Sequence, residues 1–316
     1  MRTALEIVGC PTCYRPLDPV IEANQTLLAC PKHKHQFKII NGLPHLVPAD
    51  HGEEIISIGE AMTAIRREEG WHKLPAETLL EDTVGGSLLL TQWRKTLAMI
   101  EFSVEQESIR LGRRLRIATI GGGVFHDAVS LSSKKHAVVA IDPSSDAFVG
   151  VRSAKRLSES KANRPGTVIG LPEAPPLQIG GPDIIILRGW LGVPSNPRPL
   201  LQTLITRVLP PGGLLIIGDM PVYKQALAAD RWTMTRVAKY REELGLDEEM
   251  SRRVAPILQW KLLPILDRID CQVELRVRWG VSSRWIRSGW SRIMGDELAK
   301  TPLIIVRSSD GLSVNQ

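Results

Sequence analysis

Short, continuous apolar runs recur along the chain after residue 115, each separated from the next by a segment long enough for a helix. Runs of this kind are typical of parallel strands that are buried on both faces of a sheet. The pattern therefore predicts an α/β fold with a doubly wound, Rossmann-like sheet. The runs are RIATI (116–120), AVVAI (137–141), TVI (167–169), DIIIL (183–187) and LLIIG (214–218).

Two further patterns follow the fifth run. Residues 221–266 place Met234 and Val237 on one face of a helix, so we expect a helical insertion or lid there. The run QVELRVRW (272–279) alternates apolar and polar residues, which predicts a half-exposed strand. A last apolar run, PLIIVR (302–307), predicts the strand that closes the domain.

The chain before the first run has a different pattern. Residues 51–114 mix polar and apolar positions with helical spacing, which predicts two or three linking helices. Before them, FKIINGLPHLVP is broken by Asn41-Gly42 and Pro44, as in a hairpin that closes a small sheet. We therefore expect a small domain over 1–50, helices over 51–114 and the α/β domain over 115–316.

The cysteines are concentrated near the start of the chain. Cys10 and Cys13 form a Cys-x2-Cys knuckle, and Cys30 begins a second, Cys-x2-His, knuckle that ends at His33. Four such ligands suit a tetrahedral zinc, and since protein atoms fill every position, the metal would be structural. His35 is the alternative fourth ligand. The other interpretation is three reduced thiols beside two solvated histidines.

The composition changes this picture little. With 43% hydrophobic and 23% charged residues, the chain is typical of a globular protein, which excludes whole-chain disorder. No apolar run reaches the roughly 18 to 20 residues of a membrane span, and the start lacks the apolar core of a secretory signal, so we expect a cytoplasmic protein. The net charge of +6 favours polyanionic partners without selecting one.

A glycine-rich turn, IGGGVFHDA, follows the first predicted strand. Gly121 and Gly123 allow a tight turn that brings backbone amides close to a ligand. Asp142, followed by Pro143, ends the second run, where a carboxylate can accept both hydroxyls of a ribose. Together they predict a nucleoside-containing cofactor, and a structural turn beside a surface aspartate is the alternative. A nicotinamide cofactor is disfavoured because His126 stands where that pattern requires glycine.

Over roughly residues 90–308 the sequence resembles the class I S-adenosylmethionine-dependent methyltransferases. The resemblance implies seven strands with the last one antiparallel, S-adenosylmethionine as the cofactor and methyl transfer as the reaction. Four segments carry it: Gly121-Gly122-Gly123 for the first motif, Asp142 for the ribose-binding acid, PDIIILRGWLGV (182–193) for the fourth strand, and VLPPGGLLIIGD (208–219), with its Pro-Gly-Gly, for the turn into the fifth.

Residues 10–48 are similar to the zinc-ribbon segment of rRNA guanine methyltransferases and to the small activator subunit of tRNA and protein methyltransferases. The main domain departs from its family at three positions. Thr119 replaces an acid, Phe125 replaces a third glycine, and Leu171 replaces an acid at the adenine, with Glu173 as a substitute nearby. These departures motivate the alternative function, a non-catalytic binding or assembly protein.

The resemblance also implies which residues line the site. Arg188 and Trp190 follow the fourth strand, where the acceptor or the methionine part of the cofactor would lie. His126 and Asp219 are candidates for a base or an orienting group, with helix or turn capping as their alternative role. The implied cofactor-binding residues are Gly121, Gly123, Asp142, Pro143, Leu171, Glu173 and Arg188.

The acceptor is open between a small molecule and RNA. The stretch from Arg276 to Arg292 holds five arginines and three tryptophans without an acid, a composition that can grip phosphates and stack on bases, or form a solvated face. The ribbon favours RNA, whereas a lid suits a small molecule. Arg66 and Arg67 are followed by Glu68 and Glu69, which predicts an exposed helix surface. No pattern indicates an oligomeric state.

Overall fold

The computed structural model describes most of the chain. The described residues are 2–22, 25–73, 88–189, 197–219, 226–255, 265–269, 271–276 and 303–309. No helix among them is long and apolar enough to cross a membrane.

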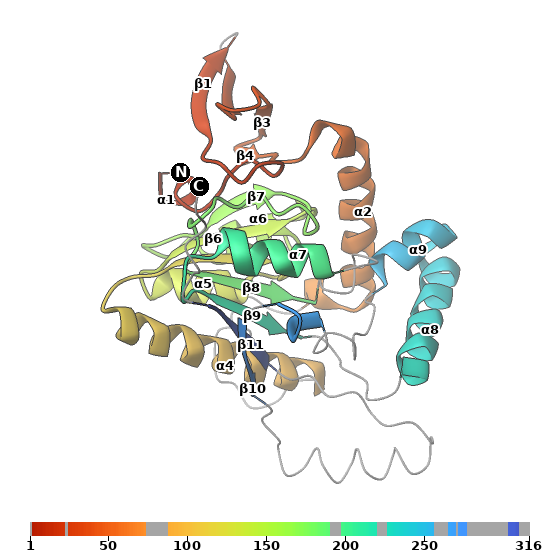
Figure 1. The fold of residues 1–316 in the computed structure, drawn as a ribbon. Helices are drawn as coiled ribbons and strands as arrows, with labels where there is room; N and C mark the ends of the chain where they lie inside the picture. The colour runs from red at the N-terminus through yellow and green to blue at the C-terminus, as the bar shows by residue number, and fades with distance from the viewer. Residues whose placement is uncertain are drawn as a thin grey trace.

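A seven-stranded sheet forms the centre of the molecule, in the order β10-β11-β9-β8-β5-β6-β7 (Figure 1). Strands β5 to β9 are parallel, and β11 pairs antiparallel with both β9 and β10. The expected doubly wound α/β sheet with an antiparallel last strand is confirmed. The strands are β5 (Arg116–Ile120), β6 (Ala137–Asp142), β7 (Gly166–Ile169), β8 (Ile184–Arg188), β9 (Leu214–Gly218), β10 (Cys271–Arg276) and β11 (Leu303–Ser308).

The strand order reverses between β5 and β8. The chain runs from β5 outward through β6 to β7 and then returns to the other side of β5 to form β8 and β9. The connections leaving β5 and β8 therefore diverge, which opens a crevice beyond the carboxyl ends of these strands. In open α/β sheets this crevice is where ligands bind.

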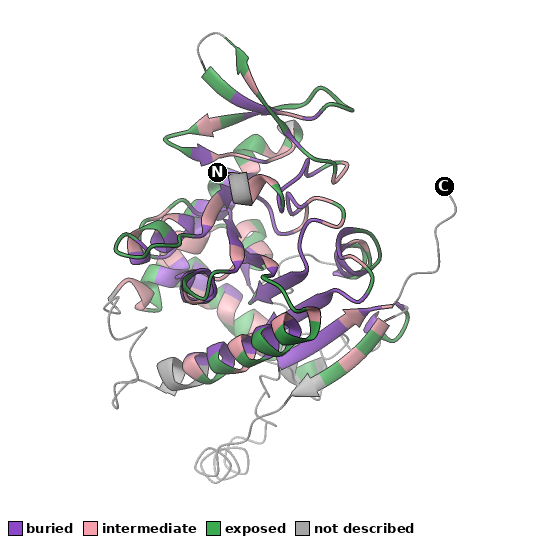
Figure 2. Cartoon of the chain, turned by 90° about the vertical axis from the view of Figure 1, so that its left-hand side faces the viewer, coloured by how far each residue is buried: buried purple, intermediate pink, exposed green. Residues whose placement is uncertain are grey.

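Helices cover both faces of the sheet, which explains the apolar runs: β8 and β9 are buried along their whole length (Figure 2). One core cluster joins a face of the sheet to α7 and the N-terminal segment, and a second joins the other face to α4, α5 and α6. The covering elements are α4 (Leu88–Leu111), α5 (His126–Ser133), α6 (Val151–Leu157), α7 (Arg198–Thr203) and the π-helical turn η3 (Leu204–Val208).

The N-terminal segment forms its own four-stranded antiparallel sheet, which we call the ribbon. Asn41 and Gly42, both with positive φ, make the expected hairpin between β3 and β4. The ribbon is joined to the main sheet, because His45 bridges Ile169 and the Leu46 amide donates to the Ile169 carbonyl. Its elements are α1 (Arg2–Leu5), β1 (Asp18–Glu22), β2 (Gln25–Ala29), β3 (Gln36–Ile40) and β4 (Leu43–Pro44).

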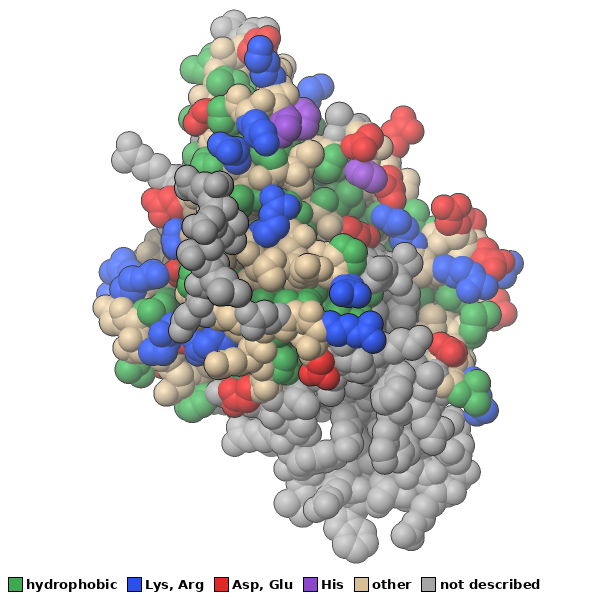
Figure 3. Space-filling view, viewed as in Figure 1, with side chains coloured by type: hydrophobic (Ala, Val, Ile, Leu, Met, Phe, Trp, Pro, Cys, Tyr) green, Lys and Arg blue, Asp and Glu red, His purple; other side chains and the backbone are tan. Residues whose placement is uncertain are grey.

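Three helices, which we call the helical cap, stand beside the sheet (Figure 1). The cap consists of α2 (Gly52–Glu68), α8 (Ala226–Leu244) and α9 (Glu248–Val254), which share an apolar cluster around Ile65, Val237 and Val254. Acidic and basic side chains are interspersed over α8 and α9 in Figure 3. The ribbon leads into α2 through one 3₁₀ turn, η1 (Ala49–His51), and a second, η2 (Trp71–Lys73), follows α2.

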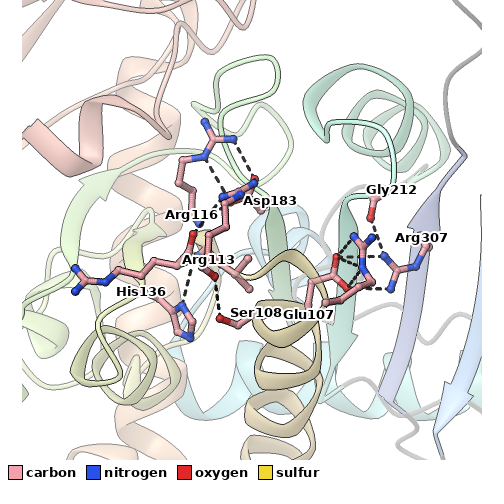
Figure 4. Close-up of polar contacts among 11 residues, drawn as sticks. Glu107, Ser108, Arg113, Arg116, His136, Asp183, Gly212 and Arg307 are labelled. Atoms are coloured by element: carbon pink, nitrogen blue, oxygen red, sulfur yellow. Dashed lines mark hydrogen bonds and ion pairs between the residues drawn. The ribbon is translucent and has the colours of Figure 1, made fainter.

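Buried carboxylates hold the elements together at the opposite end of the parallel strands (Figure 4). Asp183, just before β8, accepts hydrogen bonds from the guanidinium groups of Arg113 and Arg116. Burial opposes ionisation of Asp183, but these hydrogen bonds keep its pKa below the ordinary value. Glu107 on α4 pairs in the same way with Arg110 and Arg307.

Replacing Asp183 by Asn should lower the free energy of unfolding by about 1–2 kcal/mol, because the charge-assisted hydrogen bonds with the partly exposed Arg113 and Arg116 become weaker. Urea unfolding of the full chain measures this loss. Asp230→Asn, an exposed position on α8, is the control and should change stability little. Equal midpoints for the two variants would contradict a stabilising role for the Asp183 pairs.

Candidate functional site

The glycine-rich turn lies at the carboxyl end of β5. Gly121 and Gly123 both have positive φ, and the Gly121 amide donates to the Ile141 carbonyl of β6. Phe125, which replaces the family's third glycine, also has a positive φ of 47° and is fully buried. A left-handed conformation is costly for a residue with a bulky side chain. A Cβ added at Gly122 would lie 3.0 Å from the Phe125 ring, so this ring packs directly beneath the turn.

Asp142 lies at the carboxyl end of β6, beside the turn, and is fully buried. Its carboxylate receives two hydrogen bonds from the Arg66 guanidinium, at 3.0 and 2.8 Å, and one from the Ser144 amide at 2.9 Å. Arg66 also donates to the Val149 carbonyl, and its Nε lies 3.4 Å from a Cβ built on Gly123. A side chain of the protein therefore fills the space between the turn and the carboxylate.

The expectation of an exposed helix surface is thus wrong for Arg66, which is 6% exposed. Helical periodicity is the signal that could have located it. The buried face of α2 includes Ile55, Ile58, Gly59, Ile65 and Arg66, and these positions follow the spacing of an apolar helix face. Arg66 occurs on this face because a buried carboxylate compensates its charge.

Close contacts fix α2 against the loop that follows β6. A Cβ at Gly59 would lie 2.6 Å from the Pro143 carbonyl oxygen, so only glycine fits this position. One turn further along α2, the Thr63 hydroxyl lies 2.6 Å from the Ser144 hydroxyl. The helix thus runs directly over the end of β6, and Arg66 cannot leave Asp142 without a change in the side chain or in the helix.

The second candidate cofactor acid, Glu173, faces another arginine of the cap. Nη2 of Arg253 on α9 lies 3.4 Å from Glu173 and 2.6 Å from Glu54 of α2. Burial raises the pKa of Glu173, and its Oε2 has no hydrogen-bond partner among the described residues. Leu171 is buried, and the Gly170 amide before it donates to the Asp142 carbonyl. Both acids implied by the resemblance therefore lie against cap arginines.

Arg188 ends β8, at the crevice between β8 and β5, and is 2% exposed. It pairs with Asp219, with Nε at 2.7 Å from Oδ2, while its Nη1 lies 3.9 Å from Asp127. The guanidinium carbon lies 5.0 Å from the centre of the Trp93 ring, whose edge-on neighbour is His126. The structure therefore brings together three of the four catalytic candidates, His126, Arg188 and Asp219.

Several buried polar atoms of this cluster lack hydrogen-bond partners among the described residues. They are Oγ1 of Thr119, both ring nitrogens of His126, both carboxylate oxygens of Asp127 and Nη1 of Arg188. Each unpaired group costs about 1–3 kcal/mol in a folded protein. A concentration of such groups at a crevice is typical of a site that meets a polar ligand or ordered water. Asp127 and Trp93 were not candidates from the sequence, although Asp127 lies within the glycine-rich segment IGGGVFHDA, directly after His126.

The cluster also perturbs proton binding. Burial, followed by the charges of Arg188 and Arg156, lowers the pKa of His126 from 6.5 to about 3. His126 is therefore neutral near pH 7 and suits orientation of a group better than proton donation. Burial raises the pKa of Asp127.

Three cysteine sulfurs meet in the ribbon, within 4.8 Å of one another. Sγ of Cys13 lies 3.6 Å from Sγ of Cys30, close to the roughly 3.8 Å between two thiolates on a tetrahedral zinc. Nδ1 of His35 lies 3.9 Å from Sγ of Cys10. The His33 ring stacks on that of His35, and the His33 backbone hydrogen-bonds to Cys30. Of these two rings, that of His35 has a described contact with a sulfur, although neither ring belongs to the group within 4.8 Å. The cluster could hold a metal ion.

Two parts of the expected site lie outside the described residues. They are Trp190 and the arginine-tryptophan stretch beyond Arg276.

Solved structures of methyltransferases are similar to this chain at low identity. Phosphoethanolamine N-methyltransferase 2 of Haemonchus contortus, in complex with S-adenosylmethionine, is 13% identical over 79% of this chain and 60% of that chain, with a TM-score of 0.48. Magnesium protoporphyrin IX methyltransferase of Synechocystis PCC 6803, with bound SAH, is 14% identical over 81% and 100%, with a TM-score of 0.46. A methyltransferase of Methanosarcina mazei is 16% identical over 63% and 94%, at 0.43.

The strand order itself is that of a doubly wound, Rossmann-like α/β sheet. No protein-family model matches the sequence, and no curated protein matches it.

The pKa of His126 predicts how stability depends on pH. The pKa of His126 is lower in the folded chain than in the unfolded chain. The contribution of His126 to the free energy of unfolding is therefore complete above pH 6.5 and is lost as the pH falls towards 3. Between pH 7.5 and 5.5 this loss amounts to about 1.4 kcal/mol. His126→Gln should lose about that much less stability than the natural protein over this range, as measured by urea unfolding. Ser133→Ala, on the same helix, should retain the natural pH dependence, and identical slopes for all three proteins would contradict the assignment.

Proposed function

We propose that the protein is an S-adenosylmethionine-dependent methyltransferase. The observation that carries the proposal is the position of two groups at the carboxyl edge of the sheet. The turn at Gly121 and Gly123 follows β5, the Asp142 carboxylate ends the neighbouring strand, and the strand order reverses beside them. An amide-lined turn next to a carboxylate suits an adenosyl group.

The residues at this edge of the sheet have the chemical groups that S-adenosylmethionine requires. Asp142 would accept the ribose hydroxyls, the backbone of Gly121 and Gly123 would approach the methionine part, and Leu171 with Glu173 would border the adenine. When bound, S-adenosylmethionine supplies a methyl group activated by a sulfonium. Arg188, buried between Asp127 and Asp219, would position the acceptor. Positioning of this kind is worth up to roughly 7–11 kcal/mol.

Arg66 and a ribose compete for the same two oxygens of Asp142. Cofactor binding therefore requires Arg66 to withdraw, either by a change of side-chain conformation or with movement of α2. Breaking a buried ion pair costs about 3–5 kcal/mol, which weakens binding by roughly two to four orders of magnitude. The described state is a closed one, and the proposed enzyme alternates between it and an open, cofactor-binding state.

The same contact favours a second candidate, a non-catalytic binding or assembly protein. In that function Arg66 would take the place of the ribose permanently. The two hydrogen bonds to Asp142, the burial of both side chains and the buried Phe125 ring beneath the turn support this candidate.

Arg66→Gln should separate the two functions, because it removes the competing charge while Arg67→Gln, the adjacent helix position, leaves it in place. For the methyltransferase we expect weak binding of S-adenosylmethionine by the natural protein, at least tenfold tighter binding by Arg66→Gln, and no change in Arg67→Gln. Calorimetric titration of the full chain measures all three affinities. Thermal unfolding verifies that each variant is folded.

Absence of binding at millimolar S-adenosylmethionine in both the natural protein and folded Arg66→Gln would reject the methyltransferase. It would leave the non-catalytic function.

We propose a small molecule as the acceptor class. Arg188 is almost fully buried beneath Trp93, and α2 packs against the loop after β6, an arrangement suited to an enclosed acceptor. RNA is the alternative outcome, which nuclease-sensitive material co-purifying with the protein would indicate.

We further propose that the ribbon holds one structural zinc through Cys10, Cys13, Cys30 and one histidine. The sulfur separations fit thiolate ligation, and the contact with Cys10 favours His35 over the His33 expected from the spacing. A bound zinc would stabilise a sheet too small to bury much apolar surface.

His35→Ala should lose zinc to a chelator at least tenfold faster than the natural protein, whereas His33→Ala should retain it. Elemental analysis before and after chelation measures the metal content. Loss of zinc only from His33→Ala would instead identify His33, the residue expected from the spacing, as the fourth ligand. A folded protein purified without metal would reject the zinc site.

A further inference from the structure

A cavity of about 560 Å³ lies between the ribbon, α6 and the start of β7. None of the residues of the glycine-rich turn or of the Arg188 cluster lines it. A volume in this range is typical of small-molecule sites. The cavity is therefore a second candidate binding site, independent of the proposed methyl transfer.

The two sides of this cavity differ in chemistry. Leu5, Val8, Leu28 and Val168 contribute to an apolar wall. The α6 side carries most of the charge: the basic residues of the lining are Arg152, Lys155, Arg156 and Arg164, and Glu159 is the one acid among the lining residues. The lining thus has an excess of positive charge beside an apolar surface.

These basic side chains differ from most other arginines of the fold, which have carboxylate partners. Arg156 donates to the Ala147 carbonyl and lies over the Phe148 ring, and Arg164 donates to a backbone carbonyl. Nε of Arg152 is buried without a hydrogen-bond partner among the described residues. No ion pair with a described carboxylate involves any of the four, so their charge is available to an anion.

The lining also limits what such an anion can be. It contains no aromatic side chain, so a nucleobase would find no ring to stack on. The lining carries more positive charge than one carboxylate group of a ligand would neutralise. A phosphate monoester carries about −1.5 to −2 charges at pH 7 and therefore neutralises more of it. Guanidinium groups also match phosphate oxygens in geometry.

We propose that this cavity binds a phosphorylated aliphatic small molecule. Arg152, Lys155 and Arg156 hold the phosphate, and the aliphatic body packs on the apolar wall. Such a ligand contacts the ribbon and the α/β domain together.

Titration of the full chain with hexyl phosphate tests this proposal, with inorganic phosphate, hexanol and adenosine monophosphate as comparison probes. We expect one site that binds hexyl phosphate at least tenfold tighter than each of the other three. Arg152→Gln and Lys155→Gln should each weaken binding at least fivefold. Lys161→Gln, an exposed position outside the lining, should leave it unchanged.

Three outcomes would overturn the proposal. They are equal affinity for hexyl phosphate and inorganic phosphate, tighter binding of adenosine monophosphate, and natural affinity in folded Arg152→Gln and Lys155→Gln. Thermal unfolding without ligand verifies folding. None of these measurements involves S-adenosylmethionine, so they succeed or fail separately from the methyltransferase proposal.

Discussion

The buried ion pair between Arg66 and Asp142 is the contact on which the candidate site depends. Neither charge is stable in the interior alone, and together they satisfy each other across the end of β6. The pair thereby holds α2 over the edge of the sheet, at the place where the proposed function requires an adenosyl group to bind. In the proposed enzyme, the same two side chains set both the stability of the closed state and the access of a cofactor to Asp142.

Helix α2 connects the ribbon with the other two helices of the helical cap. Its first residue follows the ribbon through one 3₁₀ turn, its middle packs on the loop after β6, and its apolar face contacts α8 and α9. Arg253 pairs with Glu54 of α2 and with Glu173 beyond β7. A displacement of α2 would therefore disturb the ribbon junction and the contacts of both candidate cofactor acids.

The main sheet could be predicted from the sequence because parallel strands buried on both faces leave continuous apolar runs. The Asn41-Gly42 turn directly marks the hairpin between β3 and β4 of the ribbon. The presence of Arg66 between the glycine-rich turn and Asp142 could not be predicted in this way. Arg66 stands in a charged stretch with Glu68 and Glu69, and a local reading places all of them in solvent. Helical periodicity places Arg66 on the buried face of α2, but its partner is a carboxylate 76 positions away, which no local pattern identifies. Asp127 was missed because only the structure shows that its carboxylate is buried beside Arg188.

In the proposed enzyme, a ribose and Arg66 exclude each other at Asp142. The most direct measurement is a crystal structure of the protein grown with S-adenosylhomocysteine. The account predicts the ribose hydroxyls on the Asp142 carboxylate and the Arg66 guanidinium withdrawn from it. A structure with the ligand bound in the cradle and both Arg66 hydrogen bonds to Asp142 intact would contradict it.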